Sequence, residues 1–194
     1  MWNKFLNPSI FIALVFLLLI SCNSDEQKVE QSKKTGTSQE LAKDSFAYYE
    51  NLLKSDSLNN ELRLALSANY YSVKMFDKAI EHLSIVCSTD KKNKEAFAML
   101  GNVYYDTEQF EKAIEFYEQA VNLDPKNLNV RCDLATCYLN IKKYDKALDL
   151  LKKNISIDNN HIQSHHNLSV LYTQMGKTKE ADQEMKIFNK LSGK

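Results

Sequence analysis

The chain of 194 residues repeats itself at a regular interval. Leucine, tyrosine and alanine each recur four times in this register, in three separate columns. The columns are Leu66, Leu100, Leu134 and Leu168; Tyr70, Tyr104, Tyr138 and Tyr172; and Ala79, Ala113, Ala147 and Ala181. A fixed period of this length, about 34 residues, indicates stacked copies of one supersecondary unit, because a single copy cannot bury its own apolar face.

Each copy is predicted to be a pair of helices. Leu100 and Tyr104 lie four residues apart, which places them on one helical face. The whole chain holds only 4 Gly and 2 Pro, too few for the many turns of a sandwich or a barrel. The pattern predicts helices at 60–73, 76–88, 94–107, 110–122, 128–140, 144–157, 162–174 and 178–191, with an extra helix at 41–55 before them.

The second copy, residues 94–127, carries the most complete set of repeated residues. They are Phe97, Leu100, Gly101, Tyr104, Phe110, Ala113, Tyr117, Ala120 and Pro125. This set resembles the tetratricopeptide repeat, a helix-turn-helix unit of about 34 residues. The other copies keep small or polar residues in place of the Gly and the Pro: Ser67, Ala135 and Ser169 for the first, Lys91 and Asn159 for the second.

The resemblance covers residues 60–194 and divides them into four repeats, 60–93, 94–127, 128–161 and 162–194. It implies an all-α fold, a right-handed α-solenoid of four helix pairs. The segment 41–59 is predicted to add one extra helix before the array, with a signal helix and a flexible tether before that.

The two ends of the array differ. In the last repeat Asp182, Glu184 and Asn189 stand in columns that are mainly apolar in earlier repeats, so helix 178–191 is expected to be a solubilising cap. The extra helix matches a second helix that has no first helix before it. Tyr49 and Leu52 would then form an apolar edge, which is either used for binding or covered by linker residues.

Residues 1–21 are predicted to be a signal peptide. The apolar run from Ile10 to Ile20 would make a helix of about 16 Å, roughly half of what a bilayer core needs. The run ends in Leu19-Ile20-Ser21-Cys22, which resembles the bacterial lipoprotein box. The resemblance implies cleavage before Cys22 and a lipid anchor on its thiol, with acyl chains such as palmitate. The alternative is an ordinary signal peptide, or a buried start of the fold, in which Cys22 is incidental.

Residues 22–40 are predicted to be the lipidated Cys and a polar tether, because their composition cannot form a core. Asn23 follows the Cys. Similarity to the lipoprotein sorting rule, in which an Asp there retains the protein in the inner membrane, favours a lipid-anchored protein of the bacterial outer membrane that faces the periplasm. The run Ser24-Asp25-Glu26 also resembles a surface-export signal, so display outside the cell is the alternative.

The sequence predicts no enzyme, no metal and no cofactor. The 25 basic and 25 acidic residues balance, which argues against a nucleic-acid partner. No nucleotide-binding or catalytic motif occurs. His161 and His165 lie four residues apart, but His165 falls in the core column of Phe97 and no third ligand stands nearby. Three cysteines, Cys87, Cys132 and Cys137, are predicted to be small buried residues.

The resemblance implies that the first helices line a concave groove that binds a peptide. Its positions, carried over column by column, are Leu64, Ala68, Tyr71, Ala98, Asn102, Tyr105, Cys132, Thr136, Leu139, His166, Val170 and Thr173. Only Asn102 matches the set that clamps a terminal carboxylate in some relatives, and Asp133 stands where a cation would be needed, so a carboxylate clamp is not expected. Tyr71 and Tyr105 either contact the ligand or pack between repeats.

These features predict a membrane-anchored, non-enzymatic scaffold of the bacterial cell envelope. It would bind a peptide or helix of a partner protein in its concave groove. The alternative function is an envelope chaperone that holds unfolded or unassembled substrate proteins.

Overall fold

The computed structural model describes residues 46–193. The predicted signal peptide, Cys22, the tether and the start of the extra helix lie outside the described residues. The chain divides into two units, residues 1–48 and residues 49–194, and the second unit contains the whole repeat array. The fold is therefore described within this second unit.

The described residues contain helices and no strand. Residues 46–55 are helical, and eight helices follow. They are α2 (Asn60–Ser72), α3 (Phe76–Thr89), α4 (Lys94–Asp106), α5 (Phe110–Leu123), α6 (Leu128–Asn140), α7 (Tyr144–Ile157), α8 (Ile162–Gln174) and α9 (Thr178–Ser192). The predicted bounds of these eight agree with the observed ones to within one residue, and the predicted all-α solenoid is confirmed.

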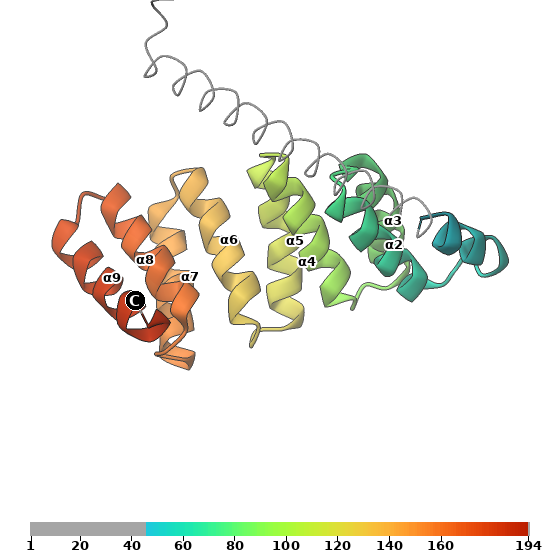
Figure 1. Ribbon diagram of the computed structural model, residues 1–194. Coiled ribbons are helices and arrows are strands. Elements are labelled where there is room, and N and C mark those ends of the chain that lie inside the picture. Colours follow the sequence, from blue (N-terminus) through green and yellow to red (C-terminus); the bar gives the residue numbers. More distant parts are fainter. Residues whose placement is uncertain (1–45, 194) are drawn as a thin grey trace, which may run out of the picture. The chain divides into compact units, whose positions relative to one another are not determined.

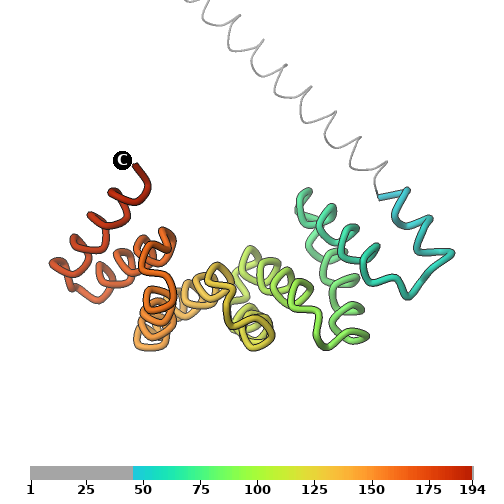
Figure 2. The backbone as a smooth tube through the Cα atoms, turned by 90° about the horizontal axis from the view of Figure 1, so that it is seen from below, coloured from blue at the N-terminus to red at the C-terminus, as the bar shows by residue number. Residues whose placement is uncertain are grey.

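Consecutive helices pack against one another along the array, both within a repeat and between repeats (Figures 1 and 2). In addition, the first helix of one repeat contacts the first helix of the next, α2 with α4 and α6 with α8. Among the described residues, no second helix contacts the second helix of the next repeat as extensively. The first helices therefore lie closer together and form the inner face of the curve.

The starts of the first helices are fixed by side chains that also recur once per repeat. Asn59, Asn93 and Asn127 each accept a hydrogen bond from the amide three residues later, at 3.0, 3.0 and 3.2 Å. Such a cap satisfies one amide that the helix itself leaves without a partner. His161 takes this position before α8 and makes no side-chain cap.

The turn between the two helices of each repeat requires a left-handed residue. Lys74, Glu108 and Lys142 have φ values of 61°, 58° and 60°, and Gly176 takes the same position in the fourth repeat with φ of 73°. The left-handed position recurs in every repeat. Only the fourth repeat has a glycine there, Gly176, and glycine adopts this conformation without steric cost.

Gly101 allows two helices to approach closely. A Cβ atom on Gly101 would lie 2.5 Å from the ring of Tyr117, the residue that faces it from α5. The column of Tyr117 holds Leu83 and Leu151 in neighbouring repeats, where Ser67 and Ala135 replace the glycine. The glycine is therefore matched to the large aromatic ring of its own repeat.

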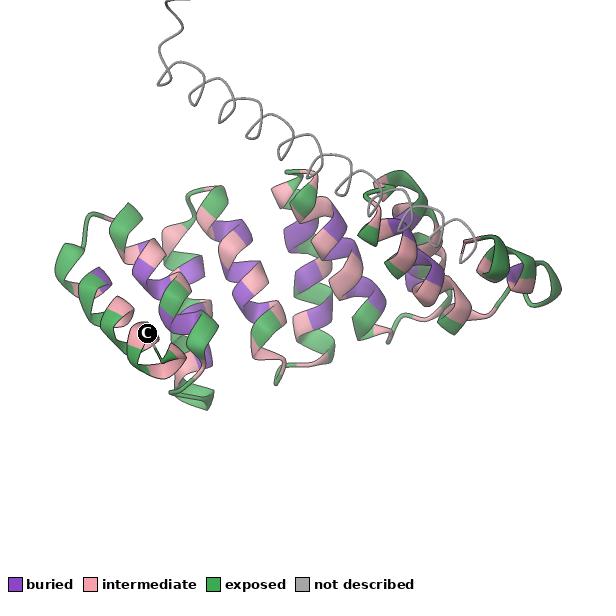
Figure 3. Ribbon diagram, in the orientation of Figure 1, coloured by how far each residue is buried: buried purple, intermediate pink, exposed green. Residues whose placement is uncertain are grey.

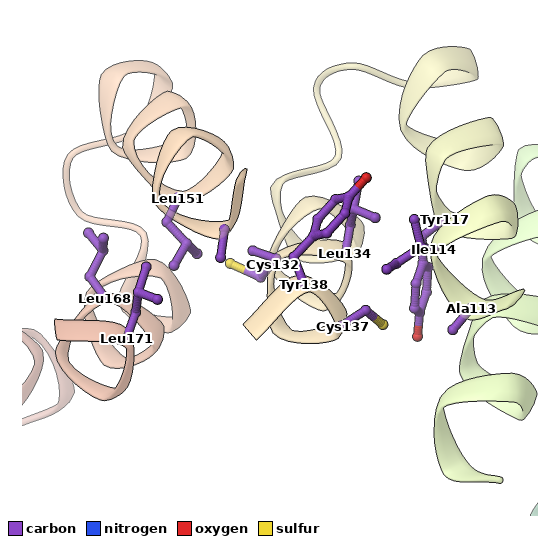
Figure 4. Packing of buried hydrophobic residues seen from close by; sticks show 12 residues of the cluster. Ala113, Ile114, Tyr117, Cys132, Leu134, Cys137, Tyr138, Leu151, Leu168 and Leu171 are labelled. Atoms are coloured by element: carbon purple, nitrogen blue, oxygen red, sulfur yellow. The ribbon is translucent and has the colours of Figure 1, made fainter. Parts of the chain in front are cut away.

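The core is continuous from α5 to α8 (Figures 3 and 4). Leu134, Leu151 and Leu168 are among its buried residues, together with Cys132 and Cys137. Cys87 is also buried, and all three described cysteines are free thiols. The prediction that the cysteines act as small core residues agrees with this packing.

One buried cation lies in this core. Arg131 is only 1% exposed, and its guanidinium donates to Asn154 Oδ1 at 2.7 Å and to the carbonyl oxygen of Pro125. Asn154 is fully buried, and its amide donates in turn to the carbonyl oxygen of Leu128 at 2.8 Å. Arg131 and Asn154 occupy the columns of Phe97 and Ala120, so an apolar pair in the second repeat becomes a hydrogen-bonded pair in the third.

The helix before the array packs as a second helix would. Tyr70 donates to Glu50 Oε1 at 2.5 Å, and Tyr138 donates to Glu118 Oε1 at the same distance, two periods later. Tyr49 and Leu52 are half-buried, so the edge predicted there is partly covered.

At the other end of the array, Ala181 is the buried residue of α9, in agreement with the predicted polar cap.

Candidate functional site

The predicted groove residues lie on the inner face and remain accessible. Ala68 and His166 are exposed, and most of the other predicted positions are half-buried: Leu64, Tyr71, Ala98, Asn102, Tyr105, Thr136, Leu139 and Val170. Thr173 is exposed as well. The prediction is wrong for Cys132, because its side chain is fully buried between α6 and its neighbours and cannot meet a ligand.

A cleft of about 250 Å³ opens at the middle of the inner face. Residues from α4, α5, α6 and α8 line it: Tyr105, Tyr117, Asp133, Thr136, Gln163 and Asn167. Tyr105 and Thr136 belong to the predicted groove. Asp133, Gln163 and Asn167 stand at positions where the rejected carboxylate clamp would need cations, and Tyr117 was not predicted to line the groove. The cleft therefore brings together side chains from three successive repeats.

Asp133 supplies the negative charge of this cleft. Its Oδ1 atom accepts one long hydrogen bond, 3.5 Å, from the Nε2 amide of Gln163. None of the ion pairs found in residues 46–193 involves Asp133. Burial raises the pKa of this carboxyl to about 6, and the bond from Gln163 opposes the rise. Asp133 is thus a carboxylate that is partly removed from water without a compensating cation.

The sequence held a signal for Asp133. Asn129, Asp133 and Thr136 are spaced by four and three residues, which puts them on one face of α6. That face is the one that carries the predicted groove residue Thr136. The spacing identifies the face but not the depth of the cleft, because Gln163 and Asn167 come from the next repeat.

The two predicted groove tyrosines have different surroundings. Tyr71 donates to Asp106 Oδ2 at 2.6 Å, a bond between the first and second repeats, and burial with this bond raises its pKa to about 12. Tyr105 packs edge-on against Phe110, with 5.6 Å between ring centres, and its hydroxyl has no hydrogen-bond partner among the described residues. Tyr71 therefore packs between repeats, which was one of the two alternatives predicted for it. Tyr105 lines the cleft, and its hydroxyl is free to bond to a ligand.

Tyr117 closes the floor of the cleft. Its hydroxyl donates to Asn102 Oδ1 at 2.7 Å. This bond holds the side chain of Asn102, a predicted groove residue, in place. On the opposite wall, the amide of Asn167 donates to Thr136 Oγ1 at 3.1 Å. These bonds fix the lining before any ligand arrives, which lowers the entropy lost on binding.

A second, larger cleft of about 610 Å³ adjoins the first. Gln163 lines both clefts, and Ile162 and Phe188 give the second one an apolar wall. His166, a predicted groove residue, lies with its ring centre 5.0 Å from that of Phe188. The remaining lining residues are Asn129, Asp158, Asn160 and His161.

The charge of the two clefts is one-sided. Asp133 lines the first and Asp158 the second, and neither lining includes a Lys or Arg. Burial lowers the pKa of His161, which keeps its imidazole neutral near pH 7. The clefts thus present carboxylates, amides and aromatic rings, a set suited to a ligand that donates hydrogen bonds or carries positive charge.

A group of polar side chains beside the second cleft resembles a catalytic arrangement in composition. His161 Nδ1 lies 2.8 Å from Ser164 Oγ, and its Nε2 lies 3.0 Å from Asn129 Oδ1. Ser164 Oγ is also 3.2 Å from the sulfur of Cys132. Both Ser164 and Cys132 are fully buried, and burial raises the pKa of the thiol. No substrate can reach either nucleophile, so this network fixes the start of α8.

Residues 46–193 contain neither a metal-binding cluster nor a membrane-spanning helix. Between residues 46 and 193, no cluster of three or more His, Cys, Asp or Glu side chains is arranged to hold a metal ion. None of the helices described there combines the length and apolar character needed to cross a bilayer.

Comparison with known proteins agrees with the repeat architecture. A family model described as "Anaphase-promoting complex, cyclosome, subunit 3" matches residues 72–154, and one described as "Tetratricopeptide repeat" matches residues 162–186. Comparison with functionally curated proteins finds no match.

Solved structures of other proteins share this helical fold. A crystal structure of MamA is 25% identical with a TM-score of 0.71, and the alignment covers 76% of this chain and 86% of that one. The structure of YrrB, described as "a TPR protein with an unusual peptide-binding site", is 21% identical with a TM-score of 0.68, and 80% of each chain is covered.

Proposed function

We propose that this chain, which resembles tetratricopeptide-repeat proteins in residues 162–186 and in its stacked helix pairs, is a non-enzymatic scaffold that binds a segment of a partner protein on its inner face. The observation that carries this proposal is the central cleft, where Asp133 forms no ion pair with the described residues and the lining is already fixed by hydrogen bonds. A peptide is the natural ligand of such a concave face, and YrrB offers a parallel by its own description.

The depth and polarity of the cleft favour a defined segment over a broad range of unfolded chains. A chaperone that holds unfolded proteins needs a wide apolar surface, whereas this lining includes Asp133, Thr136, Gln163 and Asn167. A single partner in fixed stoichiometry would support the scaffold. Many unrelated substrates bound through the same face would support the chaperone.

The proposed site of action is the bacterial cell envelope. The sequence around Cys22 supports lipid attachment, and the polar residues up to 40 support a tether that lets the array stand off the membrane. The proposed anchor is at the outer membrane with the array facing the periplasm, and display outside the cell is the alternative.

The test is a crosslinking pull-down from membranes with three forms of the full chain. The forms are wild type, a groove variant with Tyr105→Ala and Asp133→Asn, and a control with Glu115→Gln and Lys152→Ala on exposed positions of second helices. The proposal expects the groove variant to lose a partner that wild type and control retain. Equal yields of the same partners from all three forms would contradict it.

A further inference from the structure

We propose that the ligand of this groove is a basic segment, in which a Lys or Arg side chain enters the central cleft beside Asp133 and a neighbouring apolar side chain occupies the second cleft. The inference rests on the proposed function and specifies its partner. It starts from the charge and size of the two clefts.

The central cleft has the dimensions of one side chain. Its volume of about 250 Å³ lies below the roughly 300–1,000 Å³ typical of pockets for small molecules and cofactors. Four helices contribute to it, and the hydrogen bonds of Tyr117 and Asn167 hold its walls in place. A side chain projecting from a bound segment is therefore a better match than a free metabolite.

The chemistry of the cleft selects a cation. Removing a carboxylate from water without a partner is costly, and Asp133 receives only the 3.5 Å bond from Gln163. An ammonium or guanidinium group in the cleft would supply the missing charge and hydrogen-bond donors. Tyr105 and Tyr117 also line this space and contribute no charge of their own to it.

The other groups that interact with Asp133 do not compete for this role. Its charge acts on Tyr71, Tyr117, Cys132 and Cys137, all of which have raised pKa values and are uncharged at neutral pH. Asp106, nearby on the inner face, accepts the hydroxyl of Tyr71. No cation from the described chain therefore fills the place beside Asp133.

The adjoining cleft explains how the segment would continue. It shares Gln163 with the first cleft, and its wall of Ile162 and Phe188 suits an apolar side chain. Asp158 in its lining and the lack of any lining Lys or Arg exclude an acidic segment by repulsion. A basic residue close to an apolar one is the pattern that satisfies both clefts.

The test selects peptides from a random 12-residue library with the full chain in detergent. The inference expects enrichment of Lys or Arg at one position near an apolar residue. The enrichment should disappear with Asp133→Asn and persist with the control Glu115→Gln. Acidic or purely apolar peptides, or basic enrichment that survives Asp133→Asn, would overturn the inference while leaving a peptide-binding scaffold in place. Failure to select any peptide would overturn the proposed function as well.

A double-mutant cycle then measures the contact directly. The probe is the best selected peptide, labelled for fluorescence anisotropy, and its counterpart with the basic residue replaced by Gln. Removing either member of a partly buried charge pair should weaken binding by about 30-fold or more, and removing both should cost little beyond one. Losses that simply multiply would show that the basic residue binds elsewhere and would overturn the assignment to Asp133. Thermal unfolding of Asp133→Asn serves as the folding control.

Discussion

Arg63 donates a hydrogen bond of 2.7 Å to the carbonyl oxygen of Ser57, six residues earlier in the chain. The same contact recurs at the starts of two other repeats. Arg131 donates to the carbonyl of Pro125, and His165 Nε2 lies 2.9 Å from that of Asn159. These three residues share the column of Phe97, where the second repeat has an aromatic ring. A polar side chain there secures the turn that precedes α2, α6 and α8.

The residue that lies 19 positions after this column in the chain packs against it. Arg63 lies 3.2 Å from His82, His165 lies 2.6 Å from Glu184, and in the second repeat Phe97 stacks on Phe116 at 6.5 Å. The pairs are polar together or aromatic together in these repeats. The first, second and fourth repeats therefore each carry a matched pair at these two positions, whereas in the third repeat Arg131 bonds to Asn154 instead. Exchanging only one member of a pair should be unfavourable.

The first prediction concerns Arg131 and Asn154. Arg131→Phe should reduce the free energy of unfolding by about 2–4 kcal/mol, because the buried Oδ1 atom of Asn154 loses its hydrogen-bond donor. The double variant Arg131→Phe with Asn154→Ala reproduces the pair found in the second repeat and should recover much of the loss. Urea denaturation of the three forms measures both effects, and equal stability of the single and double variants would contradict the matched pair.

The second prediction concerns the close approach of α4 and α5. Gly101→Ala should destabilise the protein by about 1–3 kcal/mol, since the new Cβ would lie 2.5 Å from the ring of Tyr117. Adding Tyr117→Leu copies the combination of Ala135 with Leu151 and should relieve the clash. Thermal unfolding provides the comparison. If Gly101→Ala lowers the stability by the same amount with Tyr117 and with Tyr117→Leu, the steric explanation is wrong.

The third prediction concerns the left-handed turn residues. Glu108→Gly should stabilise the protein by up to about 1 kcal/mol, because a residue with a Cβ atom is strained at φ of 58°. Glu108→Ala removes the side chain but keeps the strain, so it should give no comparable gain. Midpoints of chemical denaturation distinguish the two. A loss of stability with glycine would mean that its greater unfolded-state entropy outweighs the strain.

The fourth prediction uses the titration of Asp133. Its folded-state pKa of about 6 lies above the ordinary value of 3.8, so the folded protein binds the proton more tightly than the unfolded chain. This group therefore favours folding less as pH rises from about 4 to 6. Asp133→Asn should be more stable than wild type by about 1 kcal/mol at pH 7, after allowance for solvent screening, with the gap closing near pH 4. Denaturation of both forms at the two pH values measures it, and a gap that does not change would contradict the buried carboxylate.

The fifth prediction concerns the anchor. Cys22→Ser should move the protein from the membrane fraction to the soluble fraction and abolish incorporation of labelled palmitate, because the proposed lipid anchor requires the thiol. Cys87→Ser serves as the matched control, since that cysteine is buried within the array. Membrane retention of Cys22→Ser without the label would show that another segment holds the protein.

The helices could be predicted from the sequence because their periodic columns are local signals that recur in all four repeats. The left-handed turns were hidden, since Lys74, Glu108 and Lys142 give no sign of a positive φ and only Gly176 does. The cleft was missed for a different reason. Its carboxylate lies on α6 but its depth depends on Gln163 and Asn167 from the following repeat, and such a site exists only after the repeats have stacked.

The groove itself is tested most directly by photo-crosslinking in cells. A photoreactive amino acid at Thr136, within the central cleft, is compared with one at Glu115, which is exposed on a second helix. The scaffold account predicts one partner joined to position 136 and none joined to position 115. Crosslinks of equal yield at both positions, or crosslinks only from the second helix, would contradict a partner held on the inner face.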